Sequence, residues 1–184
     1  MARSNPDKRP RREAQKTLLI VCEGETEAAF VRYLKEQYNT RGCGVQVKII
    51  VKNEGSPEAI IKATRRWLKG RAYNQCLIIM DTDLPWPVNR PRKSKNTEIL
   101  YFQSSPCIEG FILGIINHPN QYLTWNTNQC KKDFHKLLTE DDKLDHRKYI
   151  DILPLRLLEA KRTNIGKLHR LIMLLEGKAI TGDC

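Results

Sequence analysis

The chain has 184 residues, a formal net charge of +11, and 40% hydrophobic and 29% charged residues. This balance indicates a globular protein and excludes an intrinsically disordered chain. No apolar run approaches the roughly 20 residues that a transmembrane helix requires, and the N-terminus shows no secretion signal. We therefore expect a cytoplasmic protein without membrane contact, whose 6 scattered cysteines are reduced thiols.

The positive charge is concentrated in two segments. Residues 1–16, MARSNPDKRPRREAQK, are predicted to form a basic flexible arm, and residues 90–95 read RPRKSK. Such clusters suit the phosphate backbone of a nucleic acid; a solvated basic surface is the alternative, and it stays open here. The candidate nucleic-acid-binding residues are Arg9, Arg11, Arg12, Arg90, Arg92, Lys93 and Lys95.

Strands and helices are predicted to alternate over residues 17–117. Helical spacing predicts a first helix capped by Thr26, a second that begins at Pro57, and a third over residues 105–116. Apolar runs rich in β-branched residues predict strands over residues 17–22, 44–51, 75–80 and 97–102. This order of elements favours a parallel sheet with helices on both faces.

The remaining segments complete the predicted organisation. Residues 84–96 contain three prolines, which argue against a central strand or a helix there. Residues 118–184 show helical patterns and no strand-like run. We therefore predict a three-layer α/β/α domain at residues 17–117, with a mainly parallel four-stranded sheet, and a helical C-terminal extension at 118–184 packed on it.

Acidic residues follow two of the predicted strands. Glu23 comes directly after the first strand with Glu27 one helical turn further, and Asp81 and Asp83 follow the third strand. In an open parallel sheet, ligands bind beyond the carboxyl ends of the strands. Crowded carboxylates repel one another, and oxygen ligands suit Mg²⁺ or Mn²⁺. A divalent metal site is the functional interpretation; acids at a helix N-terminus or capping a turn are the structural alternative.

Three short motifs resemble known families. EGETE at residues 23–27 and DTD at residues 81–83 resemble the Toprim domain of topoisomerases, bacterial primases and OLD-family nucleases. SSPCIEGFILGIIN at residues 104–117 resembles a block of the RloB-like, or AbiLii-type, proteins, in which a serine-asparagine-proline turn precedes a helix that contains a glutamate. The RloB-like resemblance covers nearly everything after the basic arm.

The resemblance implies roles for individual residues. Glu23 matches the Toprim glutamate that acts as a general acid or base, and Asp81 and Asp83 match its metal-binding aspartates. Glu27 matches a further metal ligand of the OLD-type variant, and Glu109 matches the glutamate of the RloB-like block, a second candidate catalytic residue.

The third motif also departs from the family pattern. Ser105 stands where asparagine is favoured, and Gly110 and Phe111 stand where a bulky apolar residue and tryptophan are usual. These departures affect the surroundings of Glu109 more than the expected metal site.

The leading functional hypothesis is Mg²⁺- or Mn²⁺-dependent hydrolysis of phosphodiesters in nucleic acid. The RloB-like resemblance implies a role in anti-phage defence or abortive infection linked to restriction-modification, with a defence-system partner protein as one option. The alternative is a non-catalytic nucleic-acid-binding or partner-regulating subunit. A third reading is hydrolysis or transfer on a nucleotide. The oligomeric state stays open, a dimer included, and Trp86 is expected either to stack on bases or to pack on the domain surface.

Overall fold

The structure, a computed structural model, describes residues 15–53, 55–82, 85–117 and 124–180. Its strands form one sheet in the order β2-β1-β3-β5-β4. β1, β2, β3 and β5 pair in parallel, whereas the short β4 pairs antiparallel with β5. The strands are β1 (Lys16–Cys22), β2 (Val45–Val51), β3 (Gln75–Asp81), β4 (Lys93–Ser94) and β5 (Thr97–Ser104). The mainly parallel sheet is confirmed, and β4 is an additional strand.

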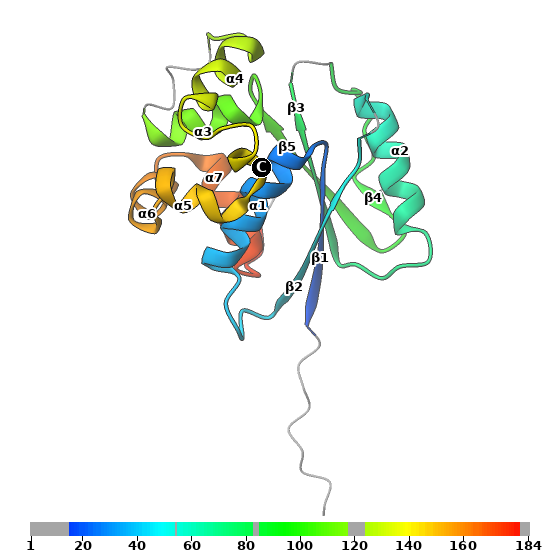
Figure 1. The fold of residues 1–184 in the computed structure, drawn as a ribbon. Helices are drawn as coiled ribbons and strands as arrows, with labels where there is room; N and C mark the ends of the chain where they lie inside the picture. Colours follow the sequence, from blue (N-terminus) through cyan, green and yellow to red (C-terminus); the bar gives the residue numbers. More distant parts are fainter. Residues whose placement is uncertain (1–14, 54, 83–84, 118–123, 181–184) are drawn as a thin grey trace, which may run out of the picture.

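Helices cover both faces of the sheet, as Figure 1 shows. α2 (Pro57–Leu68) lies alone on one face, and α1 (Glu25–Tyr38) lies with the later helices on the other. The central strands β1 and β3 are buried on both sides because their apolar side chains point alternately into the two layers. The predicted three-layer α/β/α fold is therefore confirmed.

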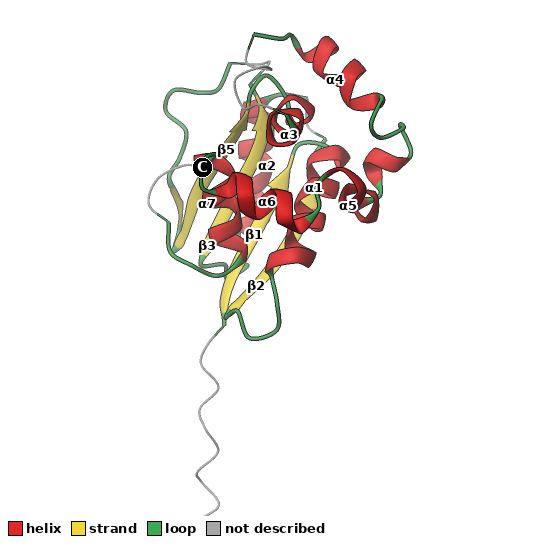
Figure 2. Cartoon of the chain, turned by 90° about the vertical axis from the view of Figure 1, so that its left-hand side faces the viewer, coloured by secondary structure: helices red, strands yellow, loops and turns green. Residues whose placement is uncertain are grey.

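The C-terminal helices share a hydrophobic core with α1 (Figure 2). The Tyr33 hydroxyl on α1 donates a hydrogen bond to the carbonyl of Leu153, and the Tyr33 and Tyr149 rings stack with centroids 6.0 Å apart. No strand occurs in residues 124–180, and the predicted boundary at residue 118 lies outside the described residues. The helices are α3 (Ile108–Ile116), α4 (Thr127–His135), α5 (Tyr149–Ile152), α6 (Leu155–Arg162) and α7 (Gly166–Leu175), with 3₁₀ turns at Asp142–Leu144 and His146–Lys148.

Two predicted helix starts are wrong. α1 begins at Glu25 with Gly24 as its N-cap, rather than being capped by Thr26, because the Glu27 carboxylate turns back and accepts a hydrogen bond from the Gly24 N–H at 3.1 Å. α3 begins at Ile108 rather than at residue 105. Ser104 is still paired with Asp81 in the sheet, so the chain needs the next three residues to turn into the helix.

Gly110 explains one departure from the family pattern. A Cβ atom at this position would lie 2.9 Å from the Cys130 Sγ on α4 and 3.0 Å from the Pro106 Cδ. Glycine therefore allows α4 to approach α3 closely. The neighbouring Phe111 is partly buried and packs on the core, edge-on to Phe102 with ring centroids 5.2 Å apart.

We predict that Gly110→Ala destabilises the protein by about 1–3 kcal/mol, because the added methyl group overpacks the contact between α3 and α4. Gly166→Ala at the start of α7 is the matched control, since no atom lies within 4 Å of its added Cβ. Alanine has a higher helix propensity than glycine, and this stabilises both variants. The control measures that contribution without the packing clash. Urea denaturation measures the effect, and a Gly110→Ala protein as stable as the control would contradict this packing.

Candidate metal centre

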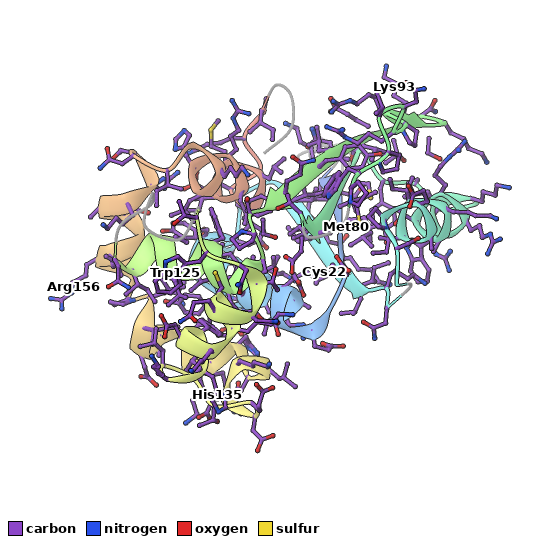
Figure 3. The ribbon with its side chains drawn as sticks, turned by 90° about the horizontal axis from the view of Figure 1, so that it is seen from above. Cys22, Met80, Lys93, Trp125, His135 and Arg156 are labelled. Carbon is purple, nitrogen blue, oxygen red and sulfur yellow. The ribbon has the colours of Figure 1, made fainter. Side chains whose placement is uncertain are left out.

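The candidate site lies where the parallel strands end. Seen from above in Figure 3, Cys22 and Met80, which precede Glu23 and Asp81, lie near each other at the centre of the molecule. The Glu23 N–H donates to the Ile79 carbonyl at 3.2 Å, and the Glu23 Oε2 accepts a hydrogen bond from the Asp81 N–H at 3.3 Å. The pairing of β1 with β3 therefore brings these two predicted site residues together.

Asp81 is held by two neighbouring elements. Its Oδ1 accepts a hydrogen bond from the Ser104 hydroxyl at the end of β5 and another from the Ile108 N–H at the start of α3, both at 2.9 Å. The N-terminal end of the α3 helix dipole also favours negative charge here. This carboxylate consequently has one fixed orientation, and Ser104 is a supporting residue that sequence reasoning missed.

Glu27 and Glu109 approach the same place from the first turns of α1 and α3. Both side chains are buried, with 6% and 4% exposure. Glu27 uses its Oε2 to hold the Gly24 N–H, whereas the Glu109 Oε2 is buried without a hydrogen-bond partner among the described residues. A buried carboxylate oxygen without a partner is costly unless a proton or a cation compensates it.

Cys107 is a further neighbour that the sequence did not reveal. One oxygen each of Asp81 and Glu109 and the Cys107 Sγ all lie within 4.8 Å of one another. Burial and the charge of Glu109 raise the pKa of the Cys107 thiol well above its ordinary value, so the thiol stays protonated at neutral pH. Because thiolates rather than thiols bind metals, the effective donor set consists of carboxylate oxygens.

The carboxylates are unusually basic. Burial, followed by the charge of Glu27, raises the pKa of Asp81 to about 8. Burial, with the charges of Glu109 and Glu23, raises the pKa of Glu27 to about 7. Within the described part of the chain, no lysine, arginine or histidine forms an ion pair with Glu27, Asp81 or Glu109. Protons or a bound cation must therefore offset the repulsion among these three carboxylates.

Of the other predicted site residues, those that the structure describes lie away from the carboxylates. Asp83, Arg9, Arg11 and Arg12 fall outside the described residues. Arg90, Arg92, Lys93 and Lys95 lie on the α2 face of the sheet, toward the beginning of β5. Lys93 pairs with Glu98, and Glu98 pairs with Gln75 at the start of β3. Since β3 ends at Asp81, Lys93 lies about 20 Å along the sheet from the carboxylates.

Trp86 packs on the domain surface, the second of the two readings considered for it. Its indole N–H donates to the Asp81 carbonyl at 3.0 Å, and its ring meets Tyr101 edge-on at 5.6 Å. The loop after β3 is thereby tied to the sheet directly behind the carboxylates.

Fold and site together define an α/β protein with a buried carboxylate cluster at the carboxyl edge of a parallel sheet. The model of the RloB-like protein family matches residues 18–169, and the chain belongs to this family. Searches of curated proteins and of solved structures give no match. Among the helices described here, none is both long and apolar enough to cross a bilayer.

We predict that the metal-free protein loses more stability than a Glu27→Gln variant does as the pH rises from about 4 to about 8. The folded-state pKa values of Asp81 and Glu27 are raised from 3.8 to about 8 and from 4.5 to about 7. The folded state therefore binds more protons than the unfolded state in this window, and its stability falls as they leave. Glu27→Gln removes one charge while a side-chain oxygen remains for the Gly24 N–H.

Urea midpoints measured across this pH window in the presence of a chelator test the prediction. The stability of Glu27→Gln should fall less steeply than that of the parent, whereas Asp151→Asn, at an exposed carboxylate that forms no ion pair with a described residue, should follow the parent. Identical slopes for all three proteins would show that Glu27 does not carry the proposed charge repulsion.

Proposed function

We propose that this protein is a divalent-cation-dependent phosphodiesterase acting on nucleic acid. The observation that carries the proposal is the convergence of three buried carboxylates, Glu27, Asp81 and Glu109, for which the described residues supply no cationic partner. Such an arrangement costs folding stability unless a cation enters it. Partly exposed Glu23 stands beside the buried group.

The residues present fit Mg²⁺ or Mn²⁺. Asp81 and Glu109 lie close enough to share an ion, Glu27 is a further candidate ligand, and Asp83 is proposed to join them. The unpartnered Oε2 of Glu109 is the strongest sign that an ion belongs here. When bound, the cation would supply positive charge to the phosphoryl oxygens and lower the pKa of a coordinated water.

The chain's own groups then have separate tasks. The hydrogen bonds from Ser104 and Ile108 hold the Asp81 carboxylate in place, so ligand geometry is established before substrate arrives. Glu23, at the more exposed mouth of the site, is proposed as the general base, whose carboxylate would accept a proton from the attacking water. The buried surroundings exclude bulk water and thereby strengthen each electrostatic interaction.

We further propose that this activity serves anti-phage defence. Membership of the RloB-like family supports that context. It also makes a partner protein, and a link to restriction-modification, reasonable expectations. A Toprim-type mechanism is part of the same proposal, supported by the position of Glu23 after β1 and Asp81 at the end of β3.

A non-catalytic role in nucleic-acid binding is the second candidate. The observation that favours it is the separation of the basic residues around Lys93 from the carboxylates, because a binding surface at that distance does not need the acidic site. The two candidates differ in whether loss of a carboxylate abolishes a reaction or leaves nucleic-acid binding unchanged.

We predict Mg²⁺- or Mn²⁺-dependent cleavage of labelled nucleic acid by the parent protein, and at least about 100-fold slower cleavage by Glu109→Gln. This near-isosteric change removes charge at an oxygen that has no hydrogen-bond partner among the described residues, so the fold should be retained. Asp83→Ala should behave in the same way, and Glu140→Gln should cleave like the parent. Single-stranded DNA, duplex DNA and RNA are assayed in parallel.

Two results would contradict the proposal. One is cleavage by Glu109→Gln and Asp83→Ala at the parent rate, which would indicate a contaminating nuclease or another site. The other is the absence of cleavage by a parent protein that binds nucleic acid equally well with and without metal, which would favour the non-catalytic candidate.

A further inference from the structure

A groove lies between α2 and the segment that leads into β4. It encloses about 730 Å³ and is lined by seven lysine and arginine side chains and one carboxylate, that of Glu58. Its lining residues extend from Glu58 to Lys69, and α2 follows the carboxyl end of β2, so the groove extends along α2 from the sheet edge that carries the acidic site. α2 lies on the face of the sheet opposite to α1 (Figure 1). The groove is a separate surface from the metal centre.

One wall of the groove is a regular row of cations. Each of Lys62, Arg65, Arg66 and the C-cap Lys69 lies three or four residues from two of the others, so they line one side of α2. All four are exposed, and none forms an ion pair with any described carboxylate. Like charges one helical turn apart destabilise a helix. The dipole at the C-terminal end of α2 favours cations there, but the repulsion within the row remains, and an anion over the row would relieve it.

The opposite wall carries three further cations, one of which is held against the sheet. The Arg90 guanidinium lies 5.0 Å from the centroid of Tyr101 and 5.5 Å from that of Trp86, so it is fixed against the sheet. Lys93 and Lys95 extend this wall from the β4–β5 hairpin, and both are exposed. Two rows of cations thus face each other across a hollow.

Lys95 stands where lysine is unfavourable. Ser94 pairs with Thr97, so Lys95 and Asn96 form a two-residue hairpin loop, and Lys95 has a positive φ of 54°. Asparagine or glycine normally occupies such a position because other residues are strained there. The cation at this end of the groove therefore comes with a cost in backbone energy.

The lining and the shape of the groove distinguish among polyanions. Besides its cations, the groove is lined by the apolar side chains of Ile61, Pro87 and Pro91. A flat bilayer would contact only the rims of the hollow, and the bases of a duplex face inward, away from these apolar side chains. A single strand places regularly spaced phosphates beside exposed bases, which matches a hollow lined by both cations and apolar side chains.

We propose that this groove binds a single strand of nucleic acid, with its phosphates along the cationic row of α2. The inference rests on the proposed function for the identity of the ligand, since the strand would be the substrate of the carboxylate site. The groove adds Lys62, Arg65, Arg66 and Lys69 to the binding surface. These four residues are not among the nucleic-acid-binding residues predicted from the sequence. α2 spans 12 residues, about 18 Å, so only a few nucleotides lie in the groove at once.

The test measures fluorescence anisotropy of labelled oligothymidylate and oligouridylate, and of a duplex of equal length, in the presence of a chelator so that no cleavage occurs. The variant Arg65→Ala/Lys69→Ala should bind single strands at least tenfold more weakly. For this variant, the slope of the logarithm of the association constant against the logarithm of the salt concentration should be shallower than for the parent by about 1.4. Each lost phosphate contact removes about 0.7 from the slope for a single strand.

Lys132→Ala/Arg156→Ala is the matched control. It removes the same charge from exposed residues on the opposite side of the molecule, where Arg156 and His135 of the Lys132 helix are seen in Figure 3. Its affinity and salt slope should stay close to those of the parent. Lys95→Asn should also weaken binding, while its stability stays equal to the parent's or rises.

Several outcomes would overturn the inference: equal losses in the α2 variant and its control, tighter binding of the duplex than of the single strand, or binding of polyglutamate or phosphatidylserine vesicles in preference to oligonucleotides. Glu109→Gln separates this inference from the proposed function, because it should bind single strands like the parent. If binding depends on the groove but no metal-dependent cleavage occurs, the proposed binding groove is supported and only the proposed phosphodiesterase activity is rejected.

Discussion

The mutual repulsion of carboxylates buried at one edge of the sheet is the constraint around which this structure is arranged. Asp81 ends β3, Glu27 and Glu109 enter from the first turns of two helices, and burial raises the pKa of Asp81 to about 8. The surroundings keep these groups in place without neutralising them. β5 contributes the Ser104 hydroxyl, and α3 contributes the Ile108 N–H. A cation, or protons in its absence, would complete the site.

The two faces of the sheet differ in structure and in the role that we assign to them. On the α1 face, the C-terminal helices enlarge the hydrophobic core, and the rings of Tyr33 and Tyr149 stack within it. That packing supports the first turns that carry Glu27 and Glu109. The α2 face has a smaller core and an exposed cationic groove. Trp86 lies between the two regions, since it packs on Tyr101 and donates a hydrogen bond to the backbone of Asp81.

The sequence predicts those features that depend on local pattern or on the general geometry of parallel sheets. Apolar runs identify β1 and β3, and strand adjacency then brings Glu23 to Asp81. Contacts between distant segments leave no such pattern: neither the approach of Cys130 to Gly110 nor the position of Cys107 beside Asp81 is visible before the chain folds. The sequence does not identify the cations of α2 as a binding surface, because lysines and arginines at helical spacing usually form a solvated face. Only the opposing wall at residues 90–95 turns them into a groove.

Calorimetric titration of Mg²⁺ and Mn²⁺ into the metal-free protein, in two buffers of different ionisation enthalpy near pH 7, tests the central claim most directly. The account predicts saturable binding that releases protons, because carboxyl groups with pKa values of about 7 and about 8 must ionise when a cation binds. It also predicts that Glu109→Gln weakens this binding. Absence of saturable binding, or binding that neither releases protons nor responds to Glu109→Gln, would contradict the account.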